Sequence, residues 1–258
     1  MVQTETKLTR PDTTQVALTT RKMYKFDSTN HVHLLDDVPL HGVTSVLGII
    51  AKPALIPWAV GVAVDYIDKK LQVMDMGGIN IVGFSPEYWE TVAKEAKSAH
   101  RKKKEKAGDW GSAVHLAVEE WIKDKKLPDL KDTQLQAFEH FKKWAEDNKV
   151  EFLESEKHVY SKDLVIGGIV DLVFMMDGKK YIGDIKTSSG IYNEAFFQMG
   201  AYNLCLESMG EHKDVEGYIV INLKKDGTMD LKMAVDMELN KNAFKHALGL
   251  YQIIQSLK

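Results

Sequence analysis

The chain has 258 residues, enough to bury a substantial core, and its 44% hydrophobic and 28% charged content is typical of a soluble globular protein. No apolar run approaches a membrane span and the N-terminus has no signal-peptide core, so we expect an intracellular protein without a membrane partner. The net charge of −3 does not indicate a strongly basic nucleic-acid-binding protein, and the single cysteine excludes an internal disulfide and any multi-cysteine metal site.

The N-terminal third is predicted to contain a tail, a hairpin and helices. Residues 1–22 are rich in Thr and charge, a composition that favours disorder. Residues 23–27 and 32–35 are predicted to form a small hairpin. The pattern becomes helical after Thr44, with one helix over residues 54–71 and then a loop marked by glycines at 77, 78 and 83.

Two successive helices are predicted in the middle of the chain. Ser85 and Pro86 suit the cap and first position of a helix that runs to about Lys106. Gly108 is expected to end this helix, because glycine is a poor helix former. The next helix is then expected over residues 110–123.

The remaining pattern is a helix followed mainly by strands. The predicted helix is 133–148; the predicted strands are 151–160, 166–176 and 179–186; then come a helix at 194–209, strands at 217–223 and 229–235, and a closing helix at 241–257.

The hairpin around Asp177 and Gly178 carries the most informative residues. Asp-Gly is a strong signal for a two-residue turn, and with that turn the paired residue numbers sum to 355. Asp171 then lies opposite Asp184, with the two side chains roughly 5 Å apart, where like charges repel. Lys186 is expected on the same face as Asp184, because strand side chains alternate.

This hairpin is predicted to be covered on both faces. Val170, Leu172 and Phe174 are expected on one face, with Ile169 and Val173 on the other. The alternative is a surface hairpin with solvated ion pairs. A buried carboxylate is costly unless it is paired or binds a metal, so two of them beside a lysine favour a divalent-cation site.

Four motifs resemble one nuclease family. They are the G-S-A-V-H of residues 111–115, the G-G-x-x-D of 167–171, the G-D-I-K-T-S of 183–188 and the Q-x-x-x-Y of 198–202. In this order they resemble the PD-(D/E)XK nuclease superfamily, and within it the RecB-like exonucleases of the stand-alone phage or bacterial type, without iron–sulfur cysteines. Val170 stands where the superfamily has proline, although Gly-Gly-x-x-Asp is common in this branch.

The resemblance implies a restriction-endonuclease-like α/β (α+β) fold, with a central mixed β-sheet flanked by helices. The nuclease core is expected over residues 108–258, after a tail at 1–22 and an N-terminal hairpin and helical region at 23–107.

The resemblance also implies a set of site residues. The expected catalytic residues are Asp171, Asp184, Lys186, Gln198 and Tyr202. The expected ligands of Mg²⁺ or Mn²⁺ are His115, Asp171, Asp184 and the carbonyl of Ile185. Thr187 and Ser188 are expected to bind a substrate phosphate, and Glu156 and Glu119 are further candidates near the metal.

A basic run lies just before the predicted His115 helix. Its members are Arg101, Lys102, Lys103 and Lys104. A solvated helix face would explain them, but their position also favours contact with DNA phosphates.

The implied activity is a metal-dependent DNA exonuclease of replication, recombination or repair, in the cytoplasm of a bacterial or phage-infected cell, with DNA and possible replication or recombination proteins as partners. The chain has no P-loop, so we expect no ATP site of its own. The alternatives are a structure-specific or single-strand endonuclease and an inactive nucleic-acid-binding protein. Retention of Asp171, Asp184 and Lys186 argues against the inactive form.

Overall fold

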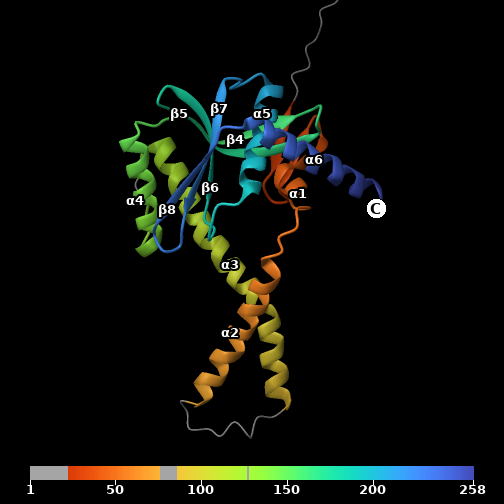
Figure 1. Ribbon diagram of the computed structural model, residues 1–258, viewed down its shortest axis with the longest axis vertical. Coiled ribbons are helices and arrows are strands. Elements are labelled where there is room, and N and C mark those ends of the chain that lie inside the picture. Colours follow the sequence, from red (N-terminus) through yellow and green to blue (C-terminus); the bar gives the residue numbers. More distant parts are fainter. Residues whose placement is uncertain (1–22, 76–85, 127) are drawn as a thin grey trace, which may run out of the picture.

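A mixed sheet forms the centre of the molecule. The computed structural model describes residues 23–75, 86–126 and 128–258, and within them eight strands pair in the order β1-β2-β3-β5-β6-β7-β8, with β4 on the remaining edge of β5 (Figure 1). The strands are β1 (Tyr24–Asp27), β2 (Val32–Leu35), β3 (Val38–Gly42), β4 (Glu151–Ser161), β5 (Ile166–Met176), β6 (Lys179–Lys186), β7 (Val215–Leu223) and β8 (Met229–Ala234). The β3–β5 and β6–β7 pairs are parallel and the others antiparallel.

Helices cover both faces of this sheet. They are α1 (Val43–Leu47), α2 (Leu55–Asp75), α3 (Pro86–Asp124), α4 (Asp132–Asp147), α5 (Asn193–Met209) and α6 (Met237–Ser256). One core packs α1, α5 and α6 on the sheet, and a second core packs α4 and the C-terminal half of α3 on its other face. Among the described residues, no helix combines the length and apolarity that crossing a membrane requires.

The predicted fold class is confirmed: the chain is α+β, with a mixed central sheet flanked by helices and a helical region on the N-terminal side. The N-terminal hairpin is also confirmed, as β1 and β2. The sequence pattern did not predict β3, which joins this hairpin to the main sheet through β5. The predicted tail and the glycine loop at 77–83 lie outside the described residues.

The expected break at Gly108 is wrong, because α3 continues through it as one helix of 39 residues. Glycine costs about 1 kcal/mol in a helix but keeps its N–H, so it does not interrupt the hydrogen-bond ladder as proline does. The helix is held at both ends: Val92 and Ala96 are buried in its first half, and Val114 and Trp121 in its second. The predicted domain boundary at 107/108 therefore falls inside α3.

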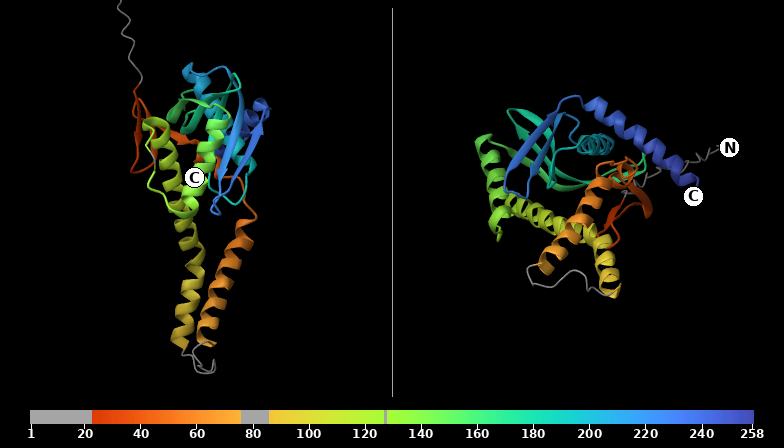
Figure 2. Two further views of the ribbon diagram at one scale, coloured as in Figure 1. Left: turned by 90° about the vertical axis from the view of Figure 1, so that its left-hand side faces the viewer. Right: turned by 60° about the horizontal axis from the view of Figure 1, so that its bottom comes forward.

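An arm projects from the body of the molecule. It consists of α2 and the N-terminal half of α3, which lie side by side and extend away from the sheet (Figures 1 and 2). Val62 of α2 and Ala99 of α3 are buried in this region, and the Tyr66 hydroxyl donates a hydrogen bond to Glu95. The same helix thus belongs to the arm at one end and to the sheet-covering layer at the other.

The register of the β5–β6 hairpin is confirmed. Pairs from Leu172–Gly183 to Met176–Lys179 follow the predicted sum, and Asp177 and Gly178 both have positive φ, of 51° and 74°. The ladder ends at Leu172. Beyond it, the Asp171 carboxylate accepts a hydrogen bond from the Ile185 backbone N–H at 2.7 Å, so an aspartate side chain continues the connection between the strands.

The predicted alternation along β5 is wrong at Asp171. Leu172 and Phe174 pack in the core beside α3 and α4, but Val170 packs with Val173 in the core beside α5. The neighbouring strand is irregular at the same level. Between the Ser155–Leu172 and Lys157–Val170 pairs, Glu156 of β4 has a φ of 52°, outside the range of a regular strand.

Candidate metal centre

Side chains from α3, β4 and β5 meet beside one pocket. Each of His115, Glu156 and Asp171 offers a ligand atom, and these atoms all lie within 4.8 Å of one another. We call these three residues the α3-side cluster. The pocket has a volume of about 470 Å³ and is lined by Gly108, Gly111, Ser112, His115, Leu116, Glu119, Glu156 and Thr187.

The helix reaches this position because of a glycine. A Cβ atom on Gly111 would lie 2.4 Å from Oγ1 of Thr187, far closer than real contacts allow. The absence of a side chain at Gly111 therefore lets α3 approach Thr187 closely. His115 follows one turn later and faces the same pocket.

His115 is in a form suited to bind a metal. Its pKa is lowered mainly by burial and also by Lys186, while Asp184 and a hydrogen bond to the Ile185 backbone oppose the shift. A neutral imidazole can donate from one ring nitrogen and offer the other as a ligand. The Ile185 carbonyl, which the resemblance implies as a metal ligand, thus lies close enough to His115 to affect its pKa.

The two aspartates of the hairpin are both costly to ionise. Burial raises the pKa of Asp171, with Lys186 and the Ile185 N–H acting against it. Burial also raises the pKa of Asp184 to about 7; Lys186 opposes this and Asp171 adds to it. Asp184 is fully buried, and its Oδ2 has no hydrogen-bond partner among the described residues. A buried carboxylate oxygen without a partner is unfavourable, and a cation would relieve it.

Glu156 adds a third carboxylate to the two mutually repelling aspartates. Its pKa is raised to about 7 by burial and by the charges of Asp171 and Glu119, while Lys123 opposes the shift. Glu156 has a φ of 52°, and its carboxylate lies with His115 on the α3 side of the sheet. A glutamate that the sequence offered only as a candidate is therefore one of the three clustered donors.

Lys186 connects the aspartates to α5. Its Nζ donates to Asp184 Oδ1 at 2.8 Å and to Gln198 Oε1 at 3.2 Å, and Gln198 Nε2 in turn donates to the Tyr202 hydroxyl at 2.7 Å. Burial acts to lower the pKa of Lys186, but Asp184 and Asp171 outweigh it and the pKa is raised. Lys186 is thus a protonated lysine whose ammonium group is fixed in position by its hydrogen bonds to Asp184 and Gln198.

A glycine also explains the position of Tyr202. A Cβ on Gly168 would come within 2.5 Å of the Tyr202 ring, so the G-G-x-x-D motif leaves room for this tyrosine beside β5. The structure brings the Gln198 and Tyr202 pair to the aspartates, as the resemblance implied.

The loop after β6 is fixed by a residue that sequence analysis missed. Asn222 of β7 is fully buried; its Oδ1 accepts from the Ser188 N–H at 3.0 Å and its Nδ2 donates to the Ser188 carbonyl at 3.1 Å. The Ser188 hydroxyl donates to the Gly190 carbonyl. Thr187 lines the pocket, whereas Ser188 mainly holds the loop. The sequence signal for this role was a single asparagine within a largely apolar strand.

The other predicted residues lie at the edges of the site. Glu119 lines the pocket, and its carboxylate forms an ion pair with Lys123, whose Nζ lies 2.5 Å from Oε1 of Glu119. The basic run at 101–104 is exposed on α3, in the arm.

The residues present fit a divalent cation. The α3-side cluster offers two carboxylates and one imidazole, beside the buried Asp184 oxygen, which has no hydrogen-bond partner in the described part of the chain. Carboxylate oxygens suit Mg²⁺, and a single imidazole makes Mn²⁺ equally suitable. His115, Glu156 and Asp171 would hold the ion, with Asp184 next to them.

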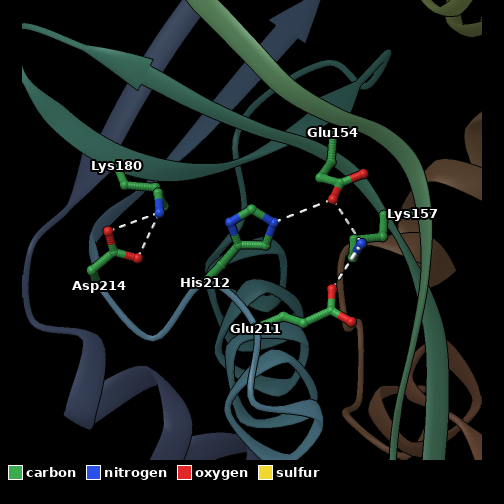
Figure 3. Close-up of polar contacts among 6 residues, drawn as sticks. All are labelled: Glu154, Lys157, Lys180, Glu211, His212 and Asp214. Carbon is green, nitrogen blue, oxygen red and sulfur yellow. Dashed lines mark hydrogen bonds and ion pairs between the residues drawn. The ribbon is translucent and has the colours of Figure 1, made fainter.

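A second group of three possible ligands lies near the C-terminal end of α5. Glu154, Glu211 and His212, the α5-side cluster, meet the same 4.8 Å limit. Here Lys157 Nζ lies between the carboxylates, 2.7 Å from Glu154 and 2.9 Å from Glu211, and His212 lies 3.3 Å from Glu154 (Figure 3). The ammonium already neutralises these acids, so this cluster is an ion-pair network.

No protein-family model matches the chain, and no curated protein matches it. Among solved structures, the crystal structure of SSO0001 is similar at 14% sequence identity and a TM-score of 0.32, over 81% of this chain and 82% of that one.

Proposed function

We propose that the protein is a metal-dependent deoxyribonuclease, and that it acts as an exonuclease in DNA replication, recombination or repair. The observation that carries the proposal is the meeting of His115, Glu156 and Asp171 within 4.8 Å, beside Asp184 and Lys186 of the next strand. Donors and ammonium come from four separate elements. The preference for an exonuclease comes from the sequence resemblance.

The raised pKa values support a cation site over a set of ordinary ion pairs. Glu156 and Asp184 each have a pKa raised to about 7, chiefly by burial, so the protein alone stabilises their charges poorly. Groups shifted by burial and by specific neighbours cluster at functional sites. A divalent cation bound here would supply Lewis-acid chemistry, neutralising phosphate charge and acidifying water.

The chain's own residues then have distinct tasks. Lys186 can donate to a phosphate oxygen or orient a water, and its bonds to Asp184 and Gln198 fix its position. Tyr202 is linked to Lys186 through Gln198, so it holds the ammonium in place from α5. Thr187 lines the pocket and offers a hydroxyl to a bound phosphate.

The test is cleavage of linear DNA labelled at the 5′ or the 3′ end, with Mg²⁺ or Mn²⁺, alongside covalently closed single-stranded circles. We expect linear DNA to be degraded and circles to resist. Lys186→Ala should lower the rate at least about a hundredfold. Lys179→Ala, an exposed lysine on the same strand, is the matched control and should cut normally.

Each alternative gives a different result. Cleavage that survives EDTA or Lys186→Ala contradicts the assignment. Rapid cutting of circles identifies an endonuclease. DNA binding without cleavage, and without a thermal shift in Mn²⁺, identifies a binding protein that uses an inactive core.

A further inference from the structure

The uninterrupted α3 helix joins the arm to the α3-side cluster. It runs from Pro86 to Asp124 and carries both the basic residues of the arm and His115 (Figure 1). Because an α-helix turns about 100° per residue, the direction in which each basic side chain points can be compared with that of His115.

A basic stripe shares the His115 face. Relative to His115, Lys97, Arg101 and Lys104 lie within about 40° around the helix axis. All three are exposed. Gly108 and Gly111 follow on the same face and line the pocket. The stripe therefore leads to the pocket without a large side chain in between.

Acidic side chains are absent from this part of the face. Between Lys94 and Ser112 of α3, the residues within about 60° of His115 are basic, histidine or small. Glu105 lies about 80° away and Asp109 about 120°. Glu119, at the far side of the pocket, is the next acid on the face. An approaching polyanion thus meets positive charge up to the pocket.

The other basic residues in and just after the run point elsewhere. Lys102, Lys103 and Lys106 lie about 120° or more from His115. The pKa of Glu95, which faces α2, is lowered mainly by the Tyr66 hydroxyl and further by Lys70 and Lys102. Lys102 is therefore on the side of α3 that faces α2. The basic residues from Lys97 to Lys106 therefore divide into a stripe that leads to the pocket and a group that points away from it.

The length of the helical segment that carries the stripe indicates which form of nucleic acid it can bind. The 18 residue steps from Lys97 to His115 span about 27 Å. A strand of duplex DNA winds away from a straight rod and returns only about 34 Å later, whereas a single strand can follow the rod. A stacked strand that rises about 3.4 Å per nucleotide covers the distance with about eight nucleotides.

We propose that Lys97, Arg101 and Lys104 form a phosphate track that holds about eight nucleotides of single-stranded nucleic acid next to the scissile bond. The inference rests on the proposed function for the identity of the pocket. It adds a strand preference and a minimum substrate length. Oligonucleotides much shorter than the track bind weakly, because they reach the pocket or the stripe but not both.

The test compares two triple variants with equal charge change. The track variant is Lys97→Gln, Arg101→Gln, Lys104→Gln, and the control is Lys102→Gln, Lys103→Gln, Lys106→Gln. Binding of oligothymidylates of 4 to about 20 nucleotides is measured by fluorescence anisotropy in EDTA over a salt series. All six positions are exposed, and circular dichroism checks that both variants are folded.

We expect wild-type affinity to rise with length until about eight nucleotides. The track variant should bind a 20-mer at least tenfold more weakly, with a slope of log affinity against log salt shallower by about 2, since each single-strand phosphate contact contributes about 0.7. The control variant should keep the wild-type slope. Equal losses in both variants, or no loss in the track variant, would overturn the track.

Two further measurements distinguish failure of the single-strand track from failure of the proposed function. A blunt duplex of the same length should lose less affinity than the single strand in the track variant; a loss confined to duplex overturns the single-strand assignment. Binding in EDTA needs no hydrolysis, so absent cleavage by the wild type rejects the proposed function while the binding series still tests the track. Wild-type cleavage with unchanged binding by the track variant rejects the track alone.

Discussion

The α3-side and α5-side clusters contain the same kinds of ligand at the same spacing, yet they differ in what neutralises them. Each has two carboxylates and one histidine with donor atoms within 4.8 Å. In the α5-side cluster, Lys157 bonds both glutamates. In the α3-side cluster the nearby Lys186 bonds Asp184 instead, and the pKa values of Glu156 and Asp171 are raised, chiefly by burial. Ligand geometry alone does not identify a metal site; the protein's own cations must be considered with it.

The largest expected effect separates the clusters by metal dependence. Asp171→Asn should lower the cleavage rate about a thousandfold, because loss of a metal ligand removes several kcal/mol of charge stabilisation. Mn²⁺ binding, measured by calorimetry, should weaken in parallel. Glu211→Gln is the control from the α5-side cluster, and it should leave both quantities unchanged. A Glu211 variant that loses Mn²⁺ binding would reverse the assignment.

The second prediction converts one cluster into the other. Lys157→Gln should release Glu154, Glu211 and His212 to bind a transition metal. In an Asp171→Asn background, calorimetry with Mn²⁺ or Zn²⁺ should reveal binding that the parent lacks. Loss of the two ion pairs should also destabilise the metal-free fold by about 1–2 kcal/mol. A variant without new binding would show that the ammonium is not what excludes the cation.

The third prediction is that the clusters respond to pH in opposite directions. The pKa of Glu156 is raised to about 7 by burial, so the folded protein binds more protons than the unfolded chain, and the free energy of unfolding falls as pH rises from about 5 to 8. Burial acts to raise the pKa of Glu154, but Lys157 and His212 outweigh it and the pKa is lowered. Stability from Glu154 is therefore present at neutral pH and lost as pH falls below about 4.5.

Thermal melts in EDTA test this contrast. Glu156→Gln should raise the Tm at pH 8 by about 2–4 °C, which corresponds to about 1 kcal/mol for a chain of this size. Glu154→Gln should lower the Tm at neutral pH, and this difference from the wild type should disappear below about pH 4.5. Equal behaviour of the two variants across the whole pH range would mean that the clusters do not differ electrostatically.

The smallest effect is expected at the ion pair beside the α5-side cluster. Lys180 Nζ lies 2.6 Å from Asp214, but the Asp214 side chain is 71% exposed (Figure 3). Because exposed pairs are screened by water, Asp214→Asn should change the free energy of unfolding by less than about 1 kcal/mol in urea titrations. A larger loss would show that this pair acts with the cluster as one network.

The hairpin of the site could be predicted because its determinants are local. Asp177 and Gly178 fix the turn, the turn fixes the register, and the register places Asp171 near Asp184. The helices with regular apolar spacing were also predicted within a few residues. The start of α6 was placed four residues late, at Lys241 in place of Met237, although the Asp236 carboxylate caps it by accepting from the Leu239 N–H.

The parts that could not be predicted depend on long-range packing. Glu154 and Glu156 are two residues apart and would share a face in a regular strand, but β4 has a positive φ at Glu156 and the two acids lie in different clusters. No local signal distinguishes the two acids. The continuity of α3 through Gly108 likewise depends on burial at both ends of the helix.

That continuity makes α3 a lever. With no break between Lys97 and His115, a tilt of about 5° at the pocket moves the far end of the 27 Å segment by roughly 2 Å. Force applied to the arm is transmitted to the imidazole in the same way. Gly108 lies within this segment, and a Cβ atom there would meet nothing within 4 Å, although glycine is a poor helix former. The unbroken helix thus couples the arm mechanically to the pocket.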